Sequence, residues 1–141
     1  MPEIINNQRK FKLEWETFQN FAVSLTETIE EVGNKAFTVA FVSDRKMRQM
    51  NRRFRGNGLT TDVLSFPFEA DEFDIADGNL GEIAISLDQA ERQAFENDLS
   101  LEIEIKQLIL HGVLHLCGYD HESDEGEMNR RELKLREILK I

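Results

Sequence analysis

All three histidines of this 141-residue chain, His111, His115 and His121, lie within one stretch of eleven residues. On an α-helix, His111 and His115 are four residues apart and project from the same face, about 40° from each other. Gly118 can adopt the left-handed conformation that ends a helix, so that the chain turns back and His121 supplies a third imidazole. Three neutral imidazoles leave a divalent ion its full charge and one open coordination position, which is typical of a catalytic zinc site.

Two other interpretations of these histidines stay open. Histidines on an apolar helix can be core residues with satisfied hydrogen bonds, although a third histidine nearby favours a metal. A closed structural zinc site needs a fourth ligand, and the nearest candidate is Cys117, the one cysteine of the chain. If the helix continues to residue 117, Cys117 points roughly 220° away from the midpoint of His111 and His115. The spacing therefore favours an open, catalytic type of site.

Length and composition predict a single domain over residues 1–141 with a core that needs no disulfide. The N-terminus lacks the basic start and long apolar run of a secretory signal, and no apolar segment approaches membrane-spanning length. A single cysteine cannot form a disulfide within the chain, which is consistent with a reducing compartment. We therefore expect a cytoplasmic protein with no membrane partner.

Charge is distributed unevenly along the chain. The formal net charge of −10 is unfavourable for binding nucleic acid, which requires clustered lysine and arginine to neutralise phosphates. Residues 45–55 nevertheless hold six cations and no acid: Arg45, Lys46, Arg48, Arg52, Arg53 and Arg55. Such a segment is usually a solvated helix face, and the alternative is a surface for RNA.

Segments of strand and helix character alternate along the chain. Strands are predicted near residues 4–5 and over 36–42, 62–68 and 80–86; helices are predicted over 13–31, 44–55, 87–97, 101–117 and 124–140. Ser86 or Asp88 should cap the third helix, and Ser100 the fourth. Pro67 cannot donate to a strand ladder, so strand 62–68 should lie at a sheet edge.

The buried side of each helix follows from its apolar residues. The fourth helix, which carries His111 and His115, is apolar nearly all round and should run through the core. On the basic helix, the inward residues should be Met47, Met50 and Phe54, and on the last helix Met128, Leu135, Ile138 and Leu139. The acidic run over 69–77 is predicted to be a solvated loop rather than a calcium site, because it lacks the glutamate that an EF-hand requires.

Four groups of residues together resemble the YbeY family of bacterial endoribonucleases, and the resemblance covers essentially the whole chain. They are His111-Gly-x-x-His115-x-x-Gly118-Tyr119-Asp120-His121, Phe54-Arg55-Gly56, Thr61-Asp62-Val63-Leu64-Ser65-Phe66-Pro67 and Gly81-Glu82-Ile83. Glu82 is a departure, since family members more often carry aspartate there, but the charge is the same.

This resemblance implies a fold and a function. The fold is a single zincin-like α+β domain, in which a small, mostly parallel four-stranded sheet packs with about five helices around a central metal-bearing helix. One Zn²⁺, or another divalent ion, is expected at His111, His115 and His121. The function is a zinc-dependent, single-strand-directed endoribonuclease that matures the 3′ end of small-subunit 16S ribosomal RNA and acts in ribosome quality control. The expected partners are ribosomal RNA, the small ribosomal subunit and ribosome-associated proteins.

The resemblance also gives Arg55 a role. The family motif before the strand contains an arginine that maps onto Arg55, whose planar guanidinium could grip two phosphate oxygens and offset charge in the transition state. A zinc ion would lower the pKa of water towards about 7 or polarise a phosphoryl oxygen. The alternative for Arg55 is an ion pair on an acidic surface. Asp120 would orient a ligand histidine or act as a base.

The sequence leaves two rival functions open. Paired histidines four apart also occur in H-E-x-x-H metallopeptidases, but here Gly112 occupies the position of the glutamate base. The second rival is a ribosome-assembly factor that binds RNA through the basic helix and uses a structural zinc without catalysis.

Overall fold

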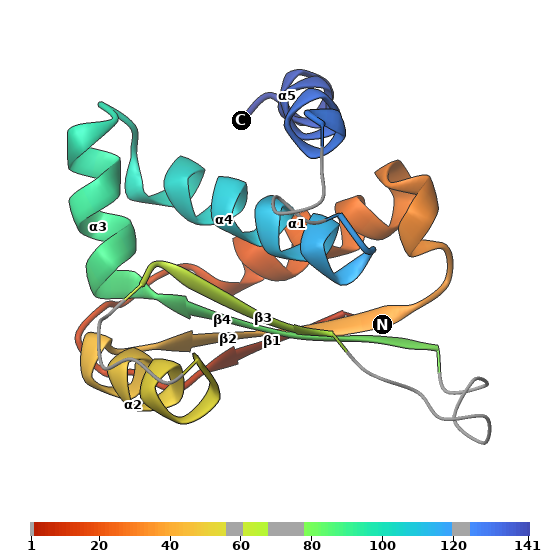
Figure 1. Ribbon diagram of the computed structural model, residues 1–141. Helices are drawn as coiled ribbons and strands as arrows, with labels where there is room; N and C mark the ends of the chain where they lie inside the picture. Colours follow the sequence, from red (N-terminus) through yellow and green to blue (C-terminus); the bar gives the residue numbers. More distant parts are fainter. Residues whose placement is uncertain (1, 56–60, 68–77, 120–124) are drawn as a thin grey trace.

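A four-stranded sheet divides the molecule into two unequal layers of helices (Figure 1). The computed structural model describes residues 2–55, 61–67, 78–119 and 125–141, with the side chains of Phe54 and Arg55 outside that description. The strands are β1 (Glu3–Asn6), β2 (Ala36–Val42), β3 (Val63–Pro67) and β4 (Asn79–Ser86), in the order β1-β2-β4-β3. β1, β2 and β4 are parallel, and β3 is antiparallel to β4. The mostly parallel sheet and the edge position of β3 confirm the sequence predictions.

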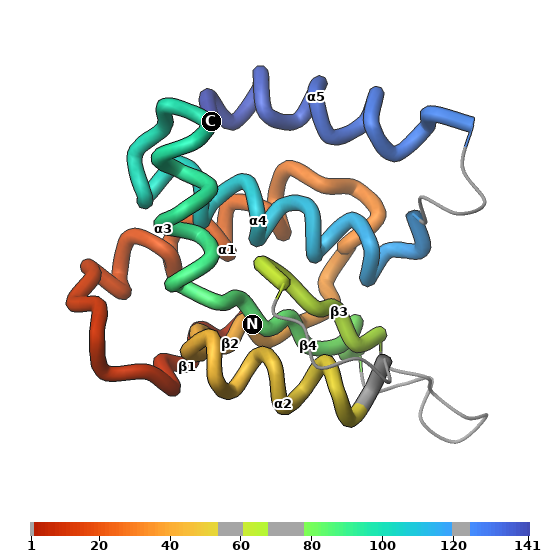
Figure 2. The backbone as a smooth tube through the Cα atoms, turned by 60° about the vertical axis from the view of Figure 1, so that its left-hand side comes forward, coloured from red at the N-terminus to blue at the C-terminus, as the bar shows by residue number. Residues whose placement is uncertain are grey.

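Five α-helices and one 3₁₀ helix accompany the sheet within the described residues. They are α1 (Trp15–Thr28), η1 (Glu30–Val32), α2 (Asp44–Arg55), α3 (Leu87–Glu96), α4 (Leu101–Leu116) and α5 (Glu127–Leu139). Of the described α-helices, α2 alone lies on one face of the sheet, and α1, α3, α4 and α5 lie on the opposite side, with α5 farthest from the sheet (Figures 1 and 2). The α+β fold class is confirmed. No helix among the described residues is long and apolar enough to cross a membrane.

The helix starts follow the predicted capping residues. Ser86 Oγ accepts a hydrogen bond from the backbone N–H of Gln89 at 3.2 Å, and Ser100 Oγ accepts one from Ile103 at 3.1 Å. Each bond satisfies one of the N–H groups that a helix leaves unpaired at its start. α4 therefore begins where the sequence predicts.

α4 runs through the main core, as its composition predicts. Its fully buried residues are Ile105, Ile109, Leu110, Val113 and Leu114. They pack with residues of α1, β2, β4 and α5 in one cluster. A smaller cluster between α2 and the other side of the sheet contains Val42, Met47, Leu64 and Ala84, with Met50 partly buried against it. A helix held on most of its circumference is a rigid support for side chains that bind a ligand.

The helix predicted over residues 13–31 is shorter in the structure. α1 ends at Thr28, Ile29 is extended (φ −93°, ψ 106°), and a 3₁₀ turn follows. Ile29 and Val32 are both fully buried. The 3₁₀ turn ends at Gly33, whose positive φ of 60° takes the chain out of the helical path.

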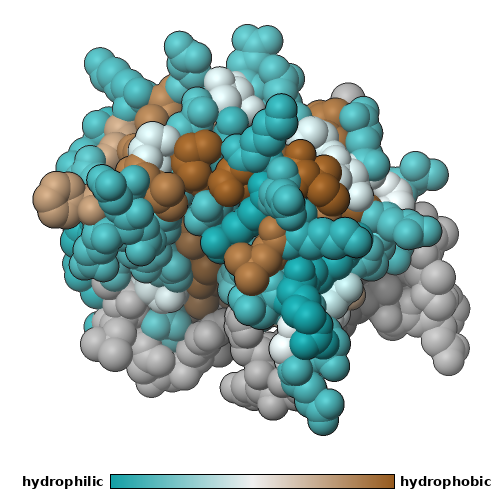
Figure 3. All heavy atoms as spheres, turned by 90° about the horizontal axis from the view of Figure 1, so that it is seen from above, coloured by the Kyte–Doolittle hydropathy of each residue, from teal (hydrophilic) through white to brown (hydrophobic). Residues whose placement is uncertain are grey.

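One inward prediction on the last helix is wrong. Ile138 is 55% exposed, whereas Met128 and Leu135 are fully buried. The inward stripe of α5 instead includes Glu132, which is only 7% exposed. Ile138 lies about 80° from Met128 around the helix, at the flank of this stripe. The face of the molecule seen from above is mostly hydrophilic, with hydrophobic residues interspersed (Figure 3).

Candidate metal centre

His111 and His115 lie together on the last two turns of α4. Their rings meet edge to face with centroids 4.7 Å apart, and their Nε2 atoms are 3.1 Å from each other. Two nitrogens that bind one tetrahedral zinc at 2.0–2.1 Å are about 3.3–3.4 Å apart. The two imidazoles are thus within a few tenths of an ångström of the spacing that one ion requires.

The opposite nitrogen of each ring has an acceptor. His115 Nδ1 is 2.9 Å from the backbone carbonyl oxygen of Tyr119, which can only accept, so Nδ1 carries the proton. His111 Nδ1 is 2.8 Å from Glu132 Oε1 on α5. With each proton on Nδ1, the lone pair of each ring is on Nε2. Two facing lone pairs repel unless a cation lies between them, so the donor set fits a divalent metal.

The third predicted ligand, His121, lies outside the described residues, as do Asp120 and the acidic run over 69–77. Within the described part of the chain, no three histidine, cysteine or acidic residues gather closely enough to hold a metal. Cys117 is therefore not assembled with His111 and His115. Its side chain packs against the main core, and burial raises the pKa of its thiol to about 11. The described residues thus bring together two of the three predicted ligands, and ligation of a metal by His111, His115 and His121 stays a prediction.

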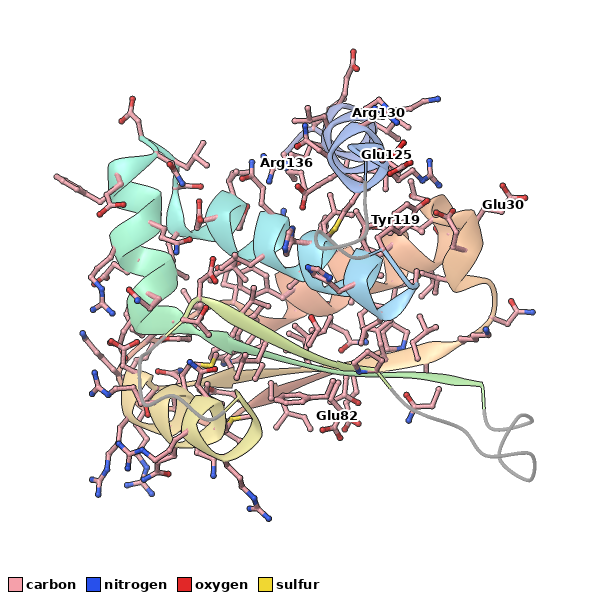
Figure 4. All side chains as sticks on the ribbon, viewed as in Figure 1. Glu30, Glu82, Tyr119, Glu125, Arg130 and Arg136 are labelled. Carbon is pink, nitrogen blue, oxygen red and sulfur yellow. The ribbon has the colours of Figure 1, made fainter. Side chains whose placement is uncertain are left out.

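A second set of contacts holds the Tyr119 carbonyl in place. The Tyr119 hydroxyl donates to Glu31 Oε2 at 2.8 Å, and Arg131 on α5 donates to both oxygens of Glu31, at 3.2 and 2.8 Å. Hydrogen bonding from Arg131 lowers the pKa of Glu31 to about 2, and the bond to Glu31 raises the pKa of Tyr119. Tyr119 lies between the end of α4 and the segment around Glu30 (Figure 4). Adjacent residues of α5, Arg131 and Glu132, thus support the two histidines.

Gly112 brings α4 close to the sheet. A Cβ at this position would lie 2.9–3.1 Å from side-chain atoms of Ile83, which is fully buried on β4. The glutamate base of an H-E-x-x-H peptidase would have to occupy this position, where the chain has no space for it. The structure therefore agrees with the sequence argument against peptide hydrolysis.

The sheet separates the basic helix from the histidine pair. α2 packs on one face and α4 on the other, and Glu82 points towards the α2 side (Figure 4). Glu82 lines a surface groove with residues of α2 and β3, namely Lys46, Gln49, Met50, Arg53 and Phe66. The substitution of aspartate by Glu82 therefore lies away from His111. Arg55 is the last residue of α2, and its side chain lies outside the described atoms.

Sequence reasoning missed Glu132 and the Tyr119 carbonyl. A signal for Glu132 was present, because it lies four residues after Met128 and three before Leu135, on the apolar stripe of its helix. A charged residue on such a stripe needs a buried partner. The carbonyl of Tyr119 had no such signal, since every residue has a backbone carbonyl.

Comparisons with known proteins identify the family to which this chain belongs. The family model described as Endoribonuclease YbeY matches residues 3–140. An Endoribonuclease YbeY of Koribacter versatilis is 44% identical over 94% of this chain and 84% of that protein, and one of Helicobacter pylori (strain Shi470) is 41% identical over 93% and 86%. A solution structure from Thermotoga maritima has a TM-score of 0.65 at 31% identity, over 95% of this chain and 85% of that chain. The chain belongs to the YbeY family of endoribonucleases.

Proposed function

We propose that this chain is a zinc-dependent endoribonuclease in which His111, His115 and His121 hold one Zn²⁺ or another divalent ion. The main support is the pair of Nε2 atoms 3.1 Å apart, each on a ring whose Nδ1 faces an oxygen acceptor. Orienting acceptors of this kind accompany metal-bound histidines and fix the tautomer that can bind. Two histidines that only fill the core would not require Nε2 atoms that face each other.

Different residues of the chain have different roles at this site. Glu132 and the Tyr119 carbonyl accept hydrogen bonds from the Nδ1 atoms, so that each ring is held with its Nε2 lone pair directed at the site. Arg55 grips two oxygens of the scissile phosphodiester and offsets the charge that develops there. When bound, zinc supplies Lewis acidity that favours attack of water on the phosphorus. Membership of the YbeY family, whose motif contains an arginine that maps onto Arg55, supports this role.

The substrate that we assign is single-stranded RNA, specifically the 3′ end of small-subunit 16S ribosomal RNA, with a role in ribosome quality control in the cytoplasm. The relatives named Endoribonuclease YbeY support the RNA substrate. The exposed cations of α2 would bind phosphates of the same RNA on the other face of the sheet. Ribosomal RNA within the small subunit, together with ribosome-associated proteins, would then be the partner.

The test uses metal-quantified protein with precursor 16S RNA and, separately, with an unstructured peptide, each with and without chelator. We expect RNA cleavage that chelator stops, that His115→Ala abolishes and that Arg55→Ala slows strongly. Lys134→Ala, an exposed cation on α5, is the control and should cleave normally. RNA cleavage that resists chelator and is equal in His115→Ala would refute the proposal.

The same experiment separates the rival functions. Cleavage of the peptide but not of the RNA would identify a metallopeptidase. Tight RNA binding without cleavage by zinc-loaded protein would identify a ribosome-assembly factor with a structural zinc. An Arg55→Ala protein that cleaves at the wild-type rate would remove the phosphate-clamp role alone.

A further inference from the structure

A groove of about 450 Å³ extends from His111 along α4 towards the start of that helix. Its walls come from α3 and the turn after it, from α4 and α5, and from the residues at the start of β3: Asp62, Val63, Gln93, Asn97, Leu99, Glu104, Gln107, Leu108, His111 and Arg136. Glu104, Gln107, Leu108 and His111 follow the spacing of one helix face. The groove and the candidate metal centre are therefore continuous, with Glu104 about 10 Å from His111 along the axis.

The floor of the groove contains a buried carboxyl group. Glu104 is only 4% exposed, and its Oε2 accepts a hydrogen bond from the side-chain amide of Asn97 at 3.4 Å. Burial and the nearby charge of Asp62 raise the pKa of Glu104. A carboxyl group in this position gains most from a ligand that donates a hydrogen bond to it.

The remaining polar groups of the groove suit a neutral ligand. Gln93, Asn97 and Gln107 each offer an amide that can donate and accept. Arg136 is the one cation among the described lining residues, and it already pairs with Glu132 at 3.4 Å. Arg136 lies between α5 and α4 (Figure 4). A phosphate would meet Asp62 and Glu104, so the groove disfavours an anion and favours a group that forms directed hydrogen bonds.

We propose that this groove binds a nucleobase with an exocyclic amino group, beside the phosphodiester held at His111. Carboxylates accept hydrogen bonds from such amino groups, and asparagine and glutamine amides pair with base edges. Uracil would present a carbonyl oxygen to Glu104 or Asp62 instead, and the two acceptors would repel. Single-stranded RNA can turn one base out of its stack into a site of this kind. The inference rests on the proposed RNA substrate and adds a base preference to it.

The first experiment measures base binding without cleavage. Cytidine and uridine 5′-monophosphate, which differ in the 4-amino group, are titrated into zinc-loaded protein while NMR follows the side-chain amides of Gln93, Asn97 and Gln107. We expect cytidine monophosphate to shift these signals and to bind at least about fivefold more tightly, the lower end for one well-paired base contact. Equal binding of the two, binding of neither, or shifts elsewhere would overturn the inference.

Variants connect the preference to the groove. Glu104→Gln keeps the shape of the side chain and removes its charge, and Gln107→Leu removes an amide; each should bring the ratio between the two nucleotides close to one. Glu102→Gln is the matched control, because Glu102 lies on the same helix but its side chain is 53% exposed and pairs with Lys106. A preference that survives in both Glu104→Gln and Gln107→Leu would contradict the assignment.

A second experiment uses single-stranded RNAs that differ only by cytidine or uridine at each position beside the scissile bond. Wild-type and Glu102→Gln proteins should favour cytidine at one of these positions, and Glu104→Gln should cleave without that preference. Cleavage by wild type with no preference would refute the base groove and leave the proposed function intact. Binding of cytidine monophosphate in the groove without cleavage of any RNA would refute the proposed function and leave the groove standing.

Discussion

Replacement of Glu132 tests whether α5 orients His111 through the ring nitrogen that faces away from the candidate metal centre. Glu132 Oε1 lies 2.8 Å from His111 Nδ1, and its Oε2 lies 3.4 Å from an Nη of Arg136. Glu132→Ala removes the acceptor that orients His111. Glu132→Gln keeps a carbonyl oxygen within reach but removes the negative charge that favours electron density on the imidazole. The two variants therefore separate orientation from charge.

The expected magnitude follows from the burial of this contact. Loss of an outer-shell partner of a metal-bound histidine typically costs 10–100-fold in affinity, or about 1.4–2.7 kcal/mol. Glu132 is only 7% exposed, so water cannot readily replace its carboxylate. We therefore expect Glu132→Ala near the upper limit. Glu132→Gln should lie near the lower limit, because a neutral acceptor forms roughly half as strong a bond as a charged one.

The assay is a competition titration of zinc between the protein and a chromophoric chelator near neutral pH. Glu137→Gln is the control, since Glu137 is exposed on the same helix. The zinc affinity of this variant should equal that of wild type. Circular dichroism confirms that each variant is folded before titration. A folded Glu132→Ala protein that binds zinc as tightly as wild type would refute the reasoning.

Three further predictions concern packing, ionisation and ligation. Gly112→Ala should lower the free energy of unfolding in urea by about 1–2 kcal/mol, because the added Cβ lies 2.9–3.1 Å from side-chain atoms of Ile83. The double variant Gly112→Ala/Ile83→Ala should lose less stability than the sum of the two single variants. Strictly additive losses would show that this contact does not limit packing. The pKa of Glu31 is lowered to about 2, so its ion pair with Arg131 stabilises the protein fully above pH 4.5 and ceases to do so as pH falls towards 2. The stability difference between wild type and Arg131→Met, about 1–2 kcal/mol for this partly exposed pair, should therefore shrink across that range, whereas a constant difference would contradict the assigned ionisation. Cys117→Ser should retain one zinc per chain by elemental analysis, and loss of the metal would restore the structural-site interpretation.

Local sequence signals predicted much of the fold. Ser86 and Ser100 cap helices as expected, Pro67 ends an edge strand, and the helix that carries His111 and His115 crosses the core. Each of these features depends on hydrogen bonding or burial within a few residues. The spacing of His111 and His115 likewise predicted their proximity, because both belong to one helix.

Contacts between distant segments could not be predicted in the same way. Glu132 reaches His111 across 21 residues and from another helix. The face on which a helix packs also depends on topology. β1, β2 and β4 are neighbours in that order across the sheet. The connection from β1 to β2 passes through α1, and the connection from β2 to β4 passes through α2 on the opposite face, so these two crossovers have opposite handedness (Figure 1). Parallel crossovers are usually right-handed, but the second one here passes through β3 and is not a simple β-α-β unit.

The position of α2 changes how the basic residues would act on RNA. An RNA segment bound by the exposed Arg48 and Arg52 of α2 lies on the opposite face of the sheet from His111. Only an RNA long enough to pass around the edge of the sheet can therefore contact both α2 and the histidine pair. For such an RNA, each lost phosphate contact should reduce the slope of log K against log salt by about 0.7.

The double variant Arg48→Ala/Arg52→Ala should therefore weaken binding of precursor 16S RNA and flatten its salt dependence, while the cleavage rate on a short oligonucleotide stays unchanged. Arg55→Ala should slow both substrates, because a clamp at the scissile phosphodiester acts whatever the length of the RNA. Equal losses on the short and long substrates for the double variant would mean that α2 contacts RNA at the cleavage site itself. The separation of the two faces by the sheet would then not govern how this chain binds RNA.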